Sequence, residues 1–298
     1  MSSLSDLLHR QRPSQWEQFL SQPCLFLARK LYTCHQSIPA NPITRPVSIV
    51  CISDTHNNQP SLPNGDILIH AGDLTSSGSL KELQATLTWL RAQPHPTKIV
   101  IAGNHDLLLD TEWNGNSNQA SVERARLDWG DIIYLENQET TIRCANGRTL
   151  RIYGSPYSAR NGNWAFQYPR SEDLWSDSVP DGIDVLVTHG PPRGHLDLLR
   201  FGCVHLLGEL WRVRPRLHVF GHIHEGAGTE WISFDGLQTV YESTVIARGG
   251  LKNLLLTFRE FIRACFYPTV EAKCLLVNPA IVGGLRDNER RQPVKVVI

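Results

Sequence analysis

Short apolar runs rich in β-branched residues recur along the chain, and many of them end in a polar cluster. The run 47–52 is the first, and Pro46 precedes it directly. Such a run, bounded by a chain-breaking residue, predicts a buried strand. The same pattern predicts further strands over 66–70, 98–102, 132–135, 150–153, 184–188, 217–220, 239–242, 274–277 and 294–297.

Helical spacing of apolar residues alternates with these strands in the first half of the chain. Residues 79–92 place four leucines on one face, with Ser79 as the expected N-cap and Glu82 at the capping-box position. Ser121 is expected to cap a second, shorter helix, and 203–213 predicts a third. Strands that alternate with helices favour a layered α/β architecture.

Two stretches lie outside this alternation. Residues 1–46 predict one or two helices followed by a proline-containing linker, so we assign them to an N-terminal extension of a domain over 47–298. Within that domain, 243–272 predicts a helical insertion, because its apolar residues recur at helical spacing. Three roles stay open for 1–32 and 251–266: packing on the domain, a dimer contact, or peripheral contact with a membrane surface.

Composition narrows the class of protein. The 298 residues are 41% hydrophobic and 19% charged, with a formal net charge of zero, so there is no electrostatic reason to expect a nucleic-acid partner. Seven cysteines without a CxxC pair indicate free thiols in a reducing compartment. With neither a spanning apolar run nor a signal-peptide pattern, we expect a cytoplasmic protein; its oligomeric state stays open.

The polar clusters at the strand ends carry the chemistry. They contribute Asp54, His56, Asp73, Asn104, His105, His189, His222 and His224. A single histidine at a strand end is commonly a surface or hydrogen-bonding residue, but five such junctions in succession are hard to explain that way. In open α/β sheets the carboxyl ends of the strands form the ligand-binding edge.

Imidazole and carboxylate together suit Mn, Fe or Zn better than Ca or Mg. Eight candidate groups exceed the needs of one tetrahedral ion and suit two divalent transition metal ions that share a carboxylate. Two such ions can clamp a phosphoryl group and activate a bridging hydroxide as the nucleophile. The sequence contains no G-x-S-x-G elbow, Walker loop or G-x-G-x-x-G motif that would favour another chemistry.

These motifs resemble the five blocks of the calcineurin-like metallophosphoesterases, in order and in residue type. The matching segments are 54–56, 72–73, 103–106, 189–190 and 221–224. The surroundings of His189 and His222 are similar to the branch of metallophosphoesterase-domain proteins related to the brain and adult 239 proteins, which is associated with hydrolysis of phosphodiesters and cyclic nucleotides. Some members of that branch carry Gly in place of the first histidine of the last block, whereas His222 is present here.

The resemblance implies an α/β (α+β) fold, a four-layer αββα sandwich of two mixed sheets flanked by helices. It implies that the first metal is held by Asp54, His56 and His224, that Asp73 bridges, and that the second metal is held by Asn104, His189 and His222. It also implies that His105 stabilises charge or protonates the leaving oxygen. For Asp106 two interpretations stay open: it orients His105 or it fixes the loop.

Other residues are candidates for substrate contact. Asn161, Trp164 and Phe166 resemble a loop beside the site in this branch and could stack a nucleobase or aryl group, with ordinary loop packing as the alternative. Asn278, at a predicted strand end, is a further candidate. His70 and His218 are expected to be core residues.

The resulting hypothesis is a dinuclear metal-dependent phosphohydrolase, a phosphodiesterase acting on a small-molecule phosphoester. A phosphomonoesterase or protein phosphatase is the alternative among enzymes, and a metal-binding scaffold without turnover is the alternative from another class. The insertion over 243–272 departs from the family pattern and lies after the last metal block, so it leaves the natural substrate open.

Overall fold

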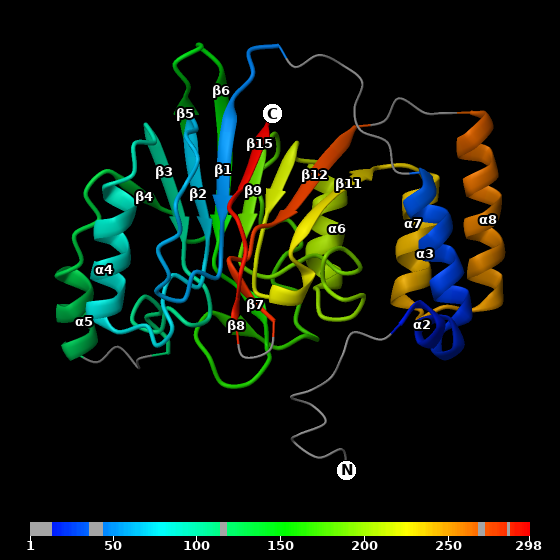
Figure 1. The fold of residues 1–298 in the computed structure, drawn as a ribbon, viewed down its shortest axis with the longest axis horizontal. Helices are drawn as coiled ribbons and strands as arrows, with labels where there is room; N and C mark the ends of the chain where they lie inside the picture. The colour runs from blue at the N-terminus through cyan, green and yellow to red at the C-terminus, as the bar shows by residue number, and fades with distance from the viewer. Residues whose placement is uncertain (1–13, 36–43, 114–117, 268–271, 285–286) are drawn as a thin grey trace.

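Two β-sheets stacked face to face form the centre of the computed structural model, which describes residues 14–35, 44–113, 118–267, 272–284 and 287–298 (Figure 1). The first sheet has the strand order β15 (Val294–Val297), β1 (Ser48–Ile52), β2 (Ile67–Ala71), β3 (Thr97–Ile101) and β4 (Ile132–Tyr134). Strands β1 to β4 are parallel, and β15 pairs with β1 in the antiparallel direction.

The second sheet is also mixed. Its order is β11 (Gly228–Ser233), β12 (Lys273–Asn278), β10 (Leu217–Val219), β9 (Val185–Thr188), β6 (Thr149–Ser155) and β5 (Gln138–Arg143). The four central strands are parallel, and both edge strands are antiparallel. Two small two-stranded sheets pair β7 (Ser158–Ala159) with β8 (Gln167–Tyr168) and β13 (Val282–Gly283) with β14 (Glu289–Arg290).

Three buried apolar layers make this a four-layer αββα sandwich, as predicted. Side chains from both sheets, such as Ile49 and Val187, form the layer between them. The outer face of the first sheet packs against α4 (Leu80–Arg91) and α5 (Asn118–Ala125), and the second sheet packs against α6 (Val204–Val213). In Figure 1, α4 and α5 lie on one side of the two sheets and α6 lies on the other.

A group of four helices lies beyond the second sheet (Figure 1). It contains α2 (Gln15–Ser21), α3 (Pro23–His35), α7 (Gly236–Ile246) and α8 (Leu251–Phe266). Helix α3 packs on both α7 and α8, and Leu25 and Tyr32 share an apolar cluster with Tyr241. The segment assigned to the N-terminal extension thus lies against the segment assigned to the insertion.

Local sequence accounts for most of these elements. The Ser79 hydroxyl accepts a bond from the Glu82 backbone N–H, and the Ser79 backbone N–H donates to the Glu82 carboxylate, so the predicted capping box of α4 is confirmed. The seven cysteines are all unpaired. His70 and His218 are buried, as predicted. No helix within the described ranges is both long enough and apolar enough to cross a membrane.

Several sequence-based predictions of elements differ from the structure. Residues 239–242 lie inside helix α7, although threonine and valine there favour a strand. The predicted strand over 294–297 is confirmed, but it pairs with β1 in the first sheet, whereas its position after the strands of the second half of the chain suggested the second sheet. Ser121 lies inside α5 and does not cap it. Finally, the edge strands β5 and β11 were not predicted, because only one of the six residues in each is buried and their polar sequences hide the alternation.

Candidate metal centre

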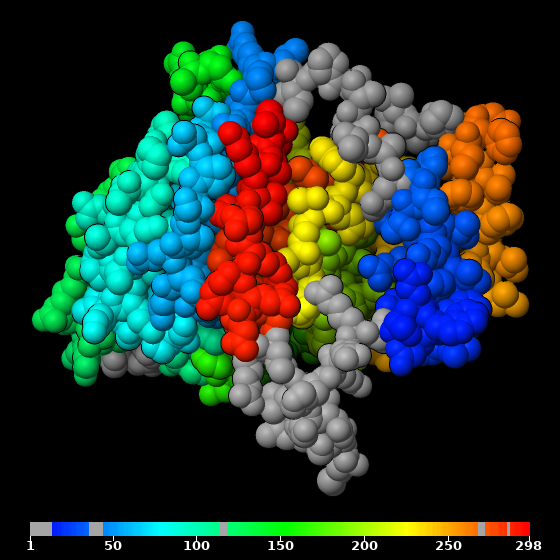
Figure 2. Space-filling model, viewed as in Figure 1, coloured from blue at the N-terminus to red at the C-terminus, as the bar shows by residue number. Residues whose placement is uncertain are grey.

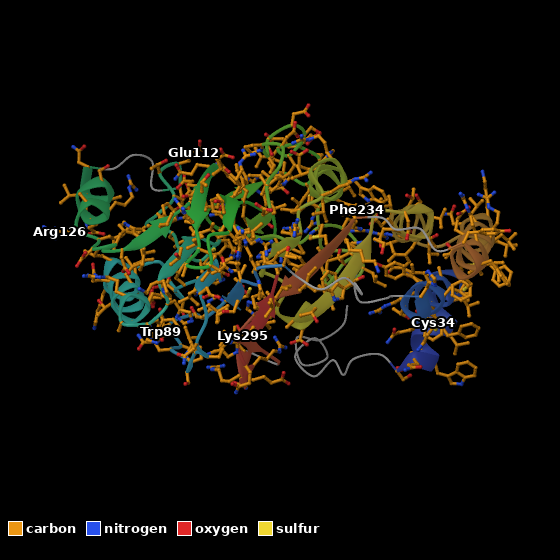
Figure 3. The ribbon with its side chains drawn as sticks, turned by 90° about the horizontal axis from the view of Figure 1, so that it is seen from above. Cys34, Trp89, Glu112, Arg126, Phe234 and Lys295 are labelled. Atoms are coloured by element: carbon orange, nitrogen blue, oxygen red, sulfur yellow. The ribbon has the colours of Figure 1, made fainter. Side chains whose placement is uncertain are left out.

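The predicted ligands meet where five strands end. Asp54 and His56 follow β1, Asp73 follows β2, Asn104 follows β3, His189 follows β9, and His222 and His224 follow β10. Because β1, β2 and β3 are parallel neighbours and β9 and β10 are parallel neighbours, their carboxyl ends meet at one edge of the stacked sheets. Figure 3 shows how densely side chains fill the space between the two sheets.

One group of four side chains has the geometry of a metal site. Asp54, His56, Asp73 and His224 each offer one ligand atom, and these atoms all lie within 4.8 Å of one another. Nε2 of His224 is 3.3 Å from Oδ1 of Asp54 and 3.4 Å from Nε2 of His56. Two carboxylates and two imidazoles at this spacing fit a divalent transition metal.

A second group lies beside the first and shares Asp73 with it. Oδ1 of Asn104 is 2.7 Å from Nδ1 of His222 and 3.0 Å from Nε2 of His189. Oδ2 of Asp73 is 3.4 Å from Nε2 of His189 and 3.7 Å from Nε2 of His56. The Asp73 carboxylate therefore stands between the two groups, and the donor set fits two ions with one common ligand.

Three of the imidazoles have a hydrogen-bond partner at Nδ1 that fixes the orientation of the ring. Nδ1 of His56 is 3.1 Å from the Thr75 carbonyl, and Nδ1 of His189 is 3.0 Å from the Ala71 carbonyl. Since a carbonyl oxygen only accepts, each Nδ1 donates and Nε2 keeps its lone pair for a metal. Nδ1 of His224 is 2.7 Å from Oδ1 of Asp287, a residue that the sequence analysis did not single out.

The backbone around the ligands is strained. Asp54, His56, Asp73 and His222 all have positive φ, between 42° and 66°, although none is glycine. Such conformations cost about 1–3 kcal/mol each and gather at functional sites. A side chain at Gly103 would collide with the Asp73 carboxylate, and one at Gly221 would collide with the Asp54 carboxylate. The fold thus gives up local stability to bring these groups together.

Electrostatics keep the two ligand carboxylates ionised. Burial alone would raise the pKa of Asp54 and of Asp73, but the neighbouring imidazoles of His224 and His189 more than offset it and hold both pKa values below the ordinary range. Burial lowers the pKa of His222 to about 3, so its imidazole is neutral. The carboxylates in turn raise the pKa values of His189 and His224 to about 9, so these two imidazoles release a proton when they bind a metal.

His105 lies over this centre without belonging to either group. Its ring meets that of His56 edge to face, with centroids 4.7 Å apart, and stacks on Trp164 with centroids 4.2 Å apart. Nδ1 is 2.9 Å from the Ser76 carbonyl, and the backbone N–H donates to Oδ1 of Asp73 at 2.8 Å. Nε2 is therefore the ring atom that can meet a substrate oxygen.

Asp106 is bonded to backbone rather than to the imidazole of His105. Its carboxylate accepts from the N–H groups of Leu74, Thr75 and Gly103 and from the Thr75 hydroxyl, at 2.8–3.2 Å. These bonds tie the loop after β2 to the loop after β3. Of the two interpretations left open for Asp106, the contacts favour loop fixation. Burial, followed by the charge of Asp73, raises its pKa to about 7.

The candidate substrate contacts separate into two kinds. Trp164 and Asn161 are exposed, and Trp164 touches the centre through His105. Phe166 is buried in the layer between the first sheet and its helices, as the packing alternative expects. Asn278 is buried as well, and it donates to the Ile223 carbonyl at 3.0 Å, so it braces the loop between His222 and His224.

Comparison with known proteins supports the same chemistry. A sequence model of the family described as "Calcineurin-like phosphoesterase" matches residues 47–226, a segment that holds every predicted metal ligand. The human "Metallophosphoesterase domain-containing protein 1" is 40% identical over 221 residues, covering 66% of this chain and 65% of that protein. A UPF0046 protein of Caenorhabditis elegans is 37% identical over 195 residues, covering 61% of this chain and 65% of that protein.

One relative matches almost the whole chain. The protein of Emericella nidulans named "Probable rhamnogalacturonate lyase C" is 43% identical over 301 residues, which is 99% of this chain but 29% of that protein. The chain thus spans less than two thirds of each of these three relatives. The lyase name describes a much longer protein, so that activity is not carried over to this chain.

Proposed function

Because the chain belongs to the calcineurin-like phosphoesterase family, we propose that it is a phosphodiesterase whose site holds two divalent transition metal ions. The single observation that carries the proposal is the position of the Asp73 carboxylate, 3.4 Å from Nε2 of His189 in one group of ligands and 3.7 Å from Nε2 of His56 in the other. A carboxylate shared in this way is the ligand that a two-metal site needs.

We assign the ligands as two sets that share Asp73. Asp54, His56 and His224 form one set, and Asn104, His189 and His222 form the other. Nitrogen and oxygen donors in this mixture suit Mn, Fe or Zn. Bound ions of this kind supply Lewis-acid stabilisation of a phosphoryl group and lower the pKa of water. The neutral amide of Asn104 completes its set without adding a negative charge that would repel phosphate.

The chain's own residues supply the remaining chemistry. His105 is placed to stabilise the phosphoryl charge or to give a proton from Nε2 to the leaving oxygen, because Nδ1 is committed to the Ser76 carbonyl. Trp164 covers one face of that imidazole, so it keeps the ring in place, and its exposed side can stack an aromatic leaving group. Asp106 keeps the loops of Asp73 and His105 in register.

The preference for a diester rests on the likeness of the motif surroundings to the branch associated with phosphodiester hydrolysis. The seven unpaired cysteines support a reducing, cytoplasmic location.

The proposal is tested by hydrolysis of bis-p-nitrophenyl phosphate after loading with Mn, comparing the wild type with His105→Ala. A general acid contributes about 10²- to 10⁴-fold to the rate, so we expect a loss of that size while the metal content stays at about two ions per chain. His205→Ala is the matched control, since His205 pairs with Asp173 and belongs to neither group of ligands. It is expected to retain full activity.

Two other outcomes have defined meanings. Hydrolysis of p-nitrophenyl phosphate in strong preference to the diester would make the protein a phosphomonoesterase. Metal binding without hydrolysis of either compound would make it a scaffold. A folded sample that binds no transition metal at all would overturn the proposal.

A further inference from the structure

Helix α8 exposes a large apolar face on the surface of the protein. Its most exposed apolar side chains are Leu251, Leu255, Phe258, Ile262 and Phe266, which are 40% to 73% exposed. At 3.6 residues per turn they lie within an arc of about 100°, so they form one continuous stripe along the helix. This apolar stripe faces away from the rest of the molecule.

The inward face of α8 is mixed, because Phe261 and Ala264 pack against the apolar cluster of α3 and α7 beside two buried polar residues. Thr257 and Glu260 are the buried residues of the helix. The Thr257 hydroxyl lies 3.2 Å from that of Thr244 in α7, and the Glu260 carboxylate lies against Gly236 at the start of α7, where a negative charge is favoured. Ordinary surface helices bury the apolar face and expose the polar one. The packing of Phe261 and Ala264, together with the polar contacts of Thr257 and Glu260, therefore holds α8 with its apolar stripe outward.

Figure 2 shows α8 along the edge of the molecule, outside α3, and in Figure 3 its side chains project outward from that edge. Tyr267, directly after the helix, and Ile246, at the end of α7, are exposed as well. An exposed apolar stripe of this length is typical of a surface that contacts another protein or a membrane.

The charges beside the stripe are basic. Lys252, Arg259 and Arg263 are exposed and lie along one flank of it, while Glu260, the one acidic residue of α8, is buried and pairs with Arg259 at 2.7 Å. The neighbouring segments add further exposed basic side chains, at Arg29, Lys30 and Arg248. The whole chain has no net charge, so this basic character is local to the helical group.

We propose that α8 lies on a membrane surface of anionic phospholipid, with the apolar stripe in the acyl–headgroup boundary and the basic flank against the headgroups. An amphipathic helix with aromatic and aliphatic residues on one face and Lys and Arg beside them binds such interfaces in this way. A second copy docked through the same stripe is disfavoured, because α8 offers no exposed acid to pair with the basic flank.

The test is co-sedimentation of the full-length protein with vesicles of phosphatidylcholine, with or without about 30% phosphatidylserine as the anionic lipid. We expect binding to the anionic vesicles that weakens as salt is raised, since salt screens the headgroup attraction. Phe258→Asp and Leu255→Asp are each expected to reduce the partition at least tenfold. Val122→Asp is the matched control, because Val122 is an equally exposed apolar residue on α5.

The basic flank is tested separately. Lys252→Glu is expected to weaken binding to anionic vesicles by about fivefold or more, in line with roughly 1 kcal/mol per basic residue near such a surface. Lys81→Glu on α4 is the matched charge control and is expected to bind as the wild type does. Circular dichroism establishes that every variant is folded.

Several results would overturn the proposal. If neutral and anionic vesicles bind the wild type equally well, the basic flank has no role in binding. If Phe258→Asp binds the vesicles as well as the wild type does, the apolar stripe has no role in binding. Light scattering that shows a dimer in the wild type and a monomer in Phe258→Asp would assign the stripe to a second copy. No binding to either kind of vesicle would overturn the proposal as a whole.

Discussion

The side chain that orients His224 is Asp287, and it shows how single residues outside the ligand set control the centre. Oδ1 of Asp287 lies 2.7 Å from Nδ1 of His224, so the carboxylate fixes the ring and leaves Nε2 directed at the first group of ligands. Partners of this kind typically change metal affinity by 10- to 100-fold. We therefore expect Asp287→Asn to weaken the binding of Mn by at least about tenfold.

Competition with a fluorescent chelator measures this loss directly and does not depend on hydrolysis. Asp173→Asn is the matched control, because Asp173 also pairs with a histidine, His205 at 3.3 Å, but belongs to neither group of ligands. It should leave the affinity unchanged. Equal affinity in Asp287→Asn and the wild type would show that the contact does not orient the ring in solution.

At the residue scale, the sequence could predict the candidate ligands that the structure brings together, but not the residues that support them. Asp54 or His189 could be found because each directly follows an apolar run, and such junctions are visible in a single chain. Asp287 lies 63 residues beyond His224 and has no neighbouring pattern of its own, so its role depends on the folded path of the chain. Phe166 was a candidate because its segment resembles a loop beside the site in the related branch, whereas the structure buries its side chain in the core.

At the scale of elements, the start of α4 has a helix cap and also a hydrogen bond to the loop that contains His56. Ser79 accepts from the Glu82 backbone N–H and Glu82 accepts in return, while a second Glu82 oxygen binds Asn57, next to the ligand His56. Ser79→Ala is expected to lower the free energy of unfolding by about 1 kcal/mol, as the loss of an N-cap does. Urea denaturation followed by circular dichroism measures this loss in the free energy of unfolding.

Ser121→Ala provides the comparison for this cap. Ser121 lies inside α5, where alanine is a better helix former than serine, so its replacement should leave the free energy of unfolding unchanged or slightly higher. If the two variants lose equal stability, Ser121 caps its helix as the sequence first suggested, and the start of α5 at Asn118 is wrong.

The elements that were mispredicted share a physical cause. In α7, Thr239 and Val240 favour a strand locally, yet the packing of Tyr241 and Leu237 against α3 decides for a helix. In α8, helical spacing predicted the element correctly, but periodicity cannot tell which face is covered. That depends on the packing of Phe261 on α3 and α7 and on the polar contacts of Thr257 and Glu260 with α7, which join separate elements.

At the scale of the whole molecule, a buried polar network ties the helical group to the second sheet. Tyr32 of α3 donates to Gln238 of α7 at 2.8 Å, and Gln238 donates to Glu242 at 2.6 Å. His195 lies between Glu242, at 3.1 Å, and Glu230 of β11, at 2.9 Å. The network therefore joins the N-terminal helices to the part of the chain that contains the candidate metal centre.

This network predicts how the stability of the molecule depends on pH. Burial lowers the pKa of His195, but Glu230 and Glu242 outweigh burial and raise that pKa to about 10, above its ordinary value of 6.5. The folded protein thus holds a proton that the unfolded chain releases above pH 6.5. The stabilisation is complete below pH 6.5 and is lost as pH rises toward 10, by up to about 1.4 kcal/mol per pH unit.

Urea denaturation at intervals between pH 6.5 and 9.5 measures this slope. His195→Gln, which cannot titrate, should be less stable than the wild type at pH 6.5, and its free energy of unfolding should fall less steeply with pH. His205→Gln removes a half-exposed histidine that pairs with Asp173, so it should keep the slope of the wild type. A slope unchanged in His195→Gln would mean that His195 is neutral in the fold, and that the network is held by hydrogen bonds without the charge.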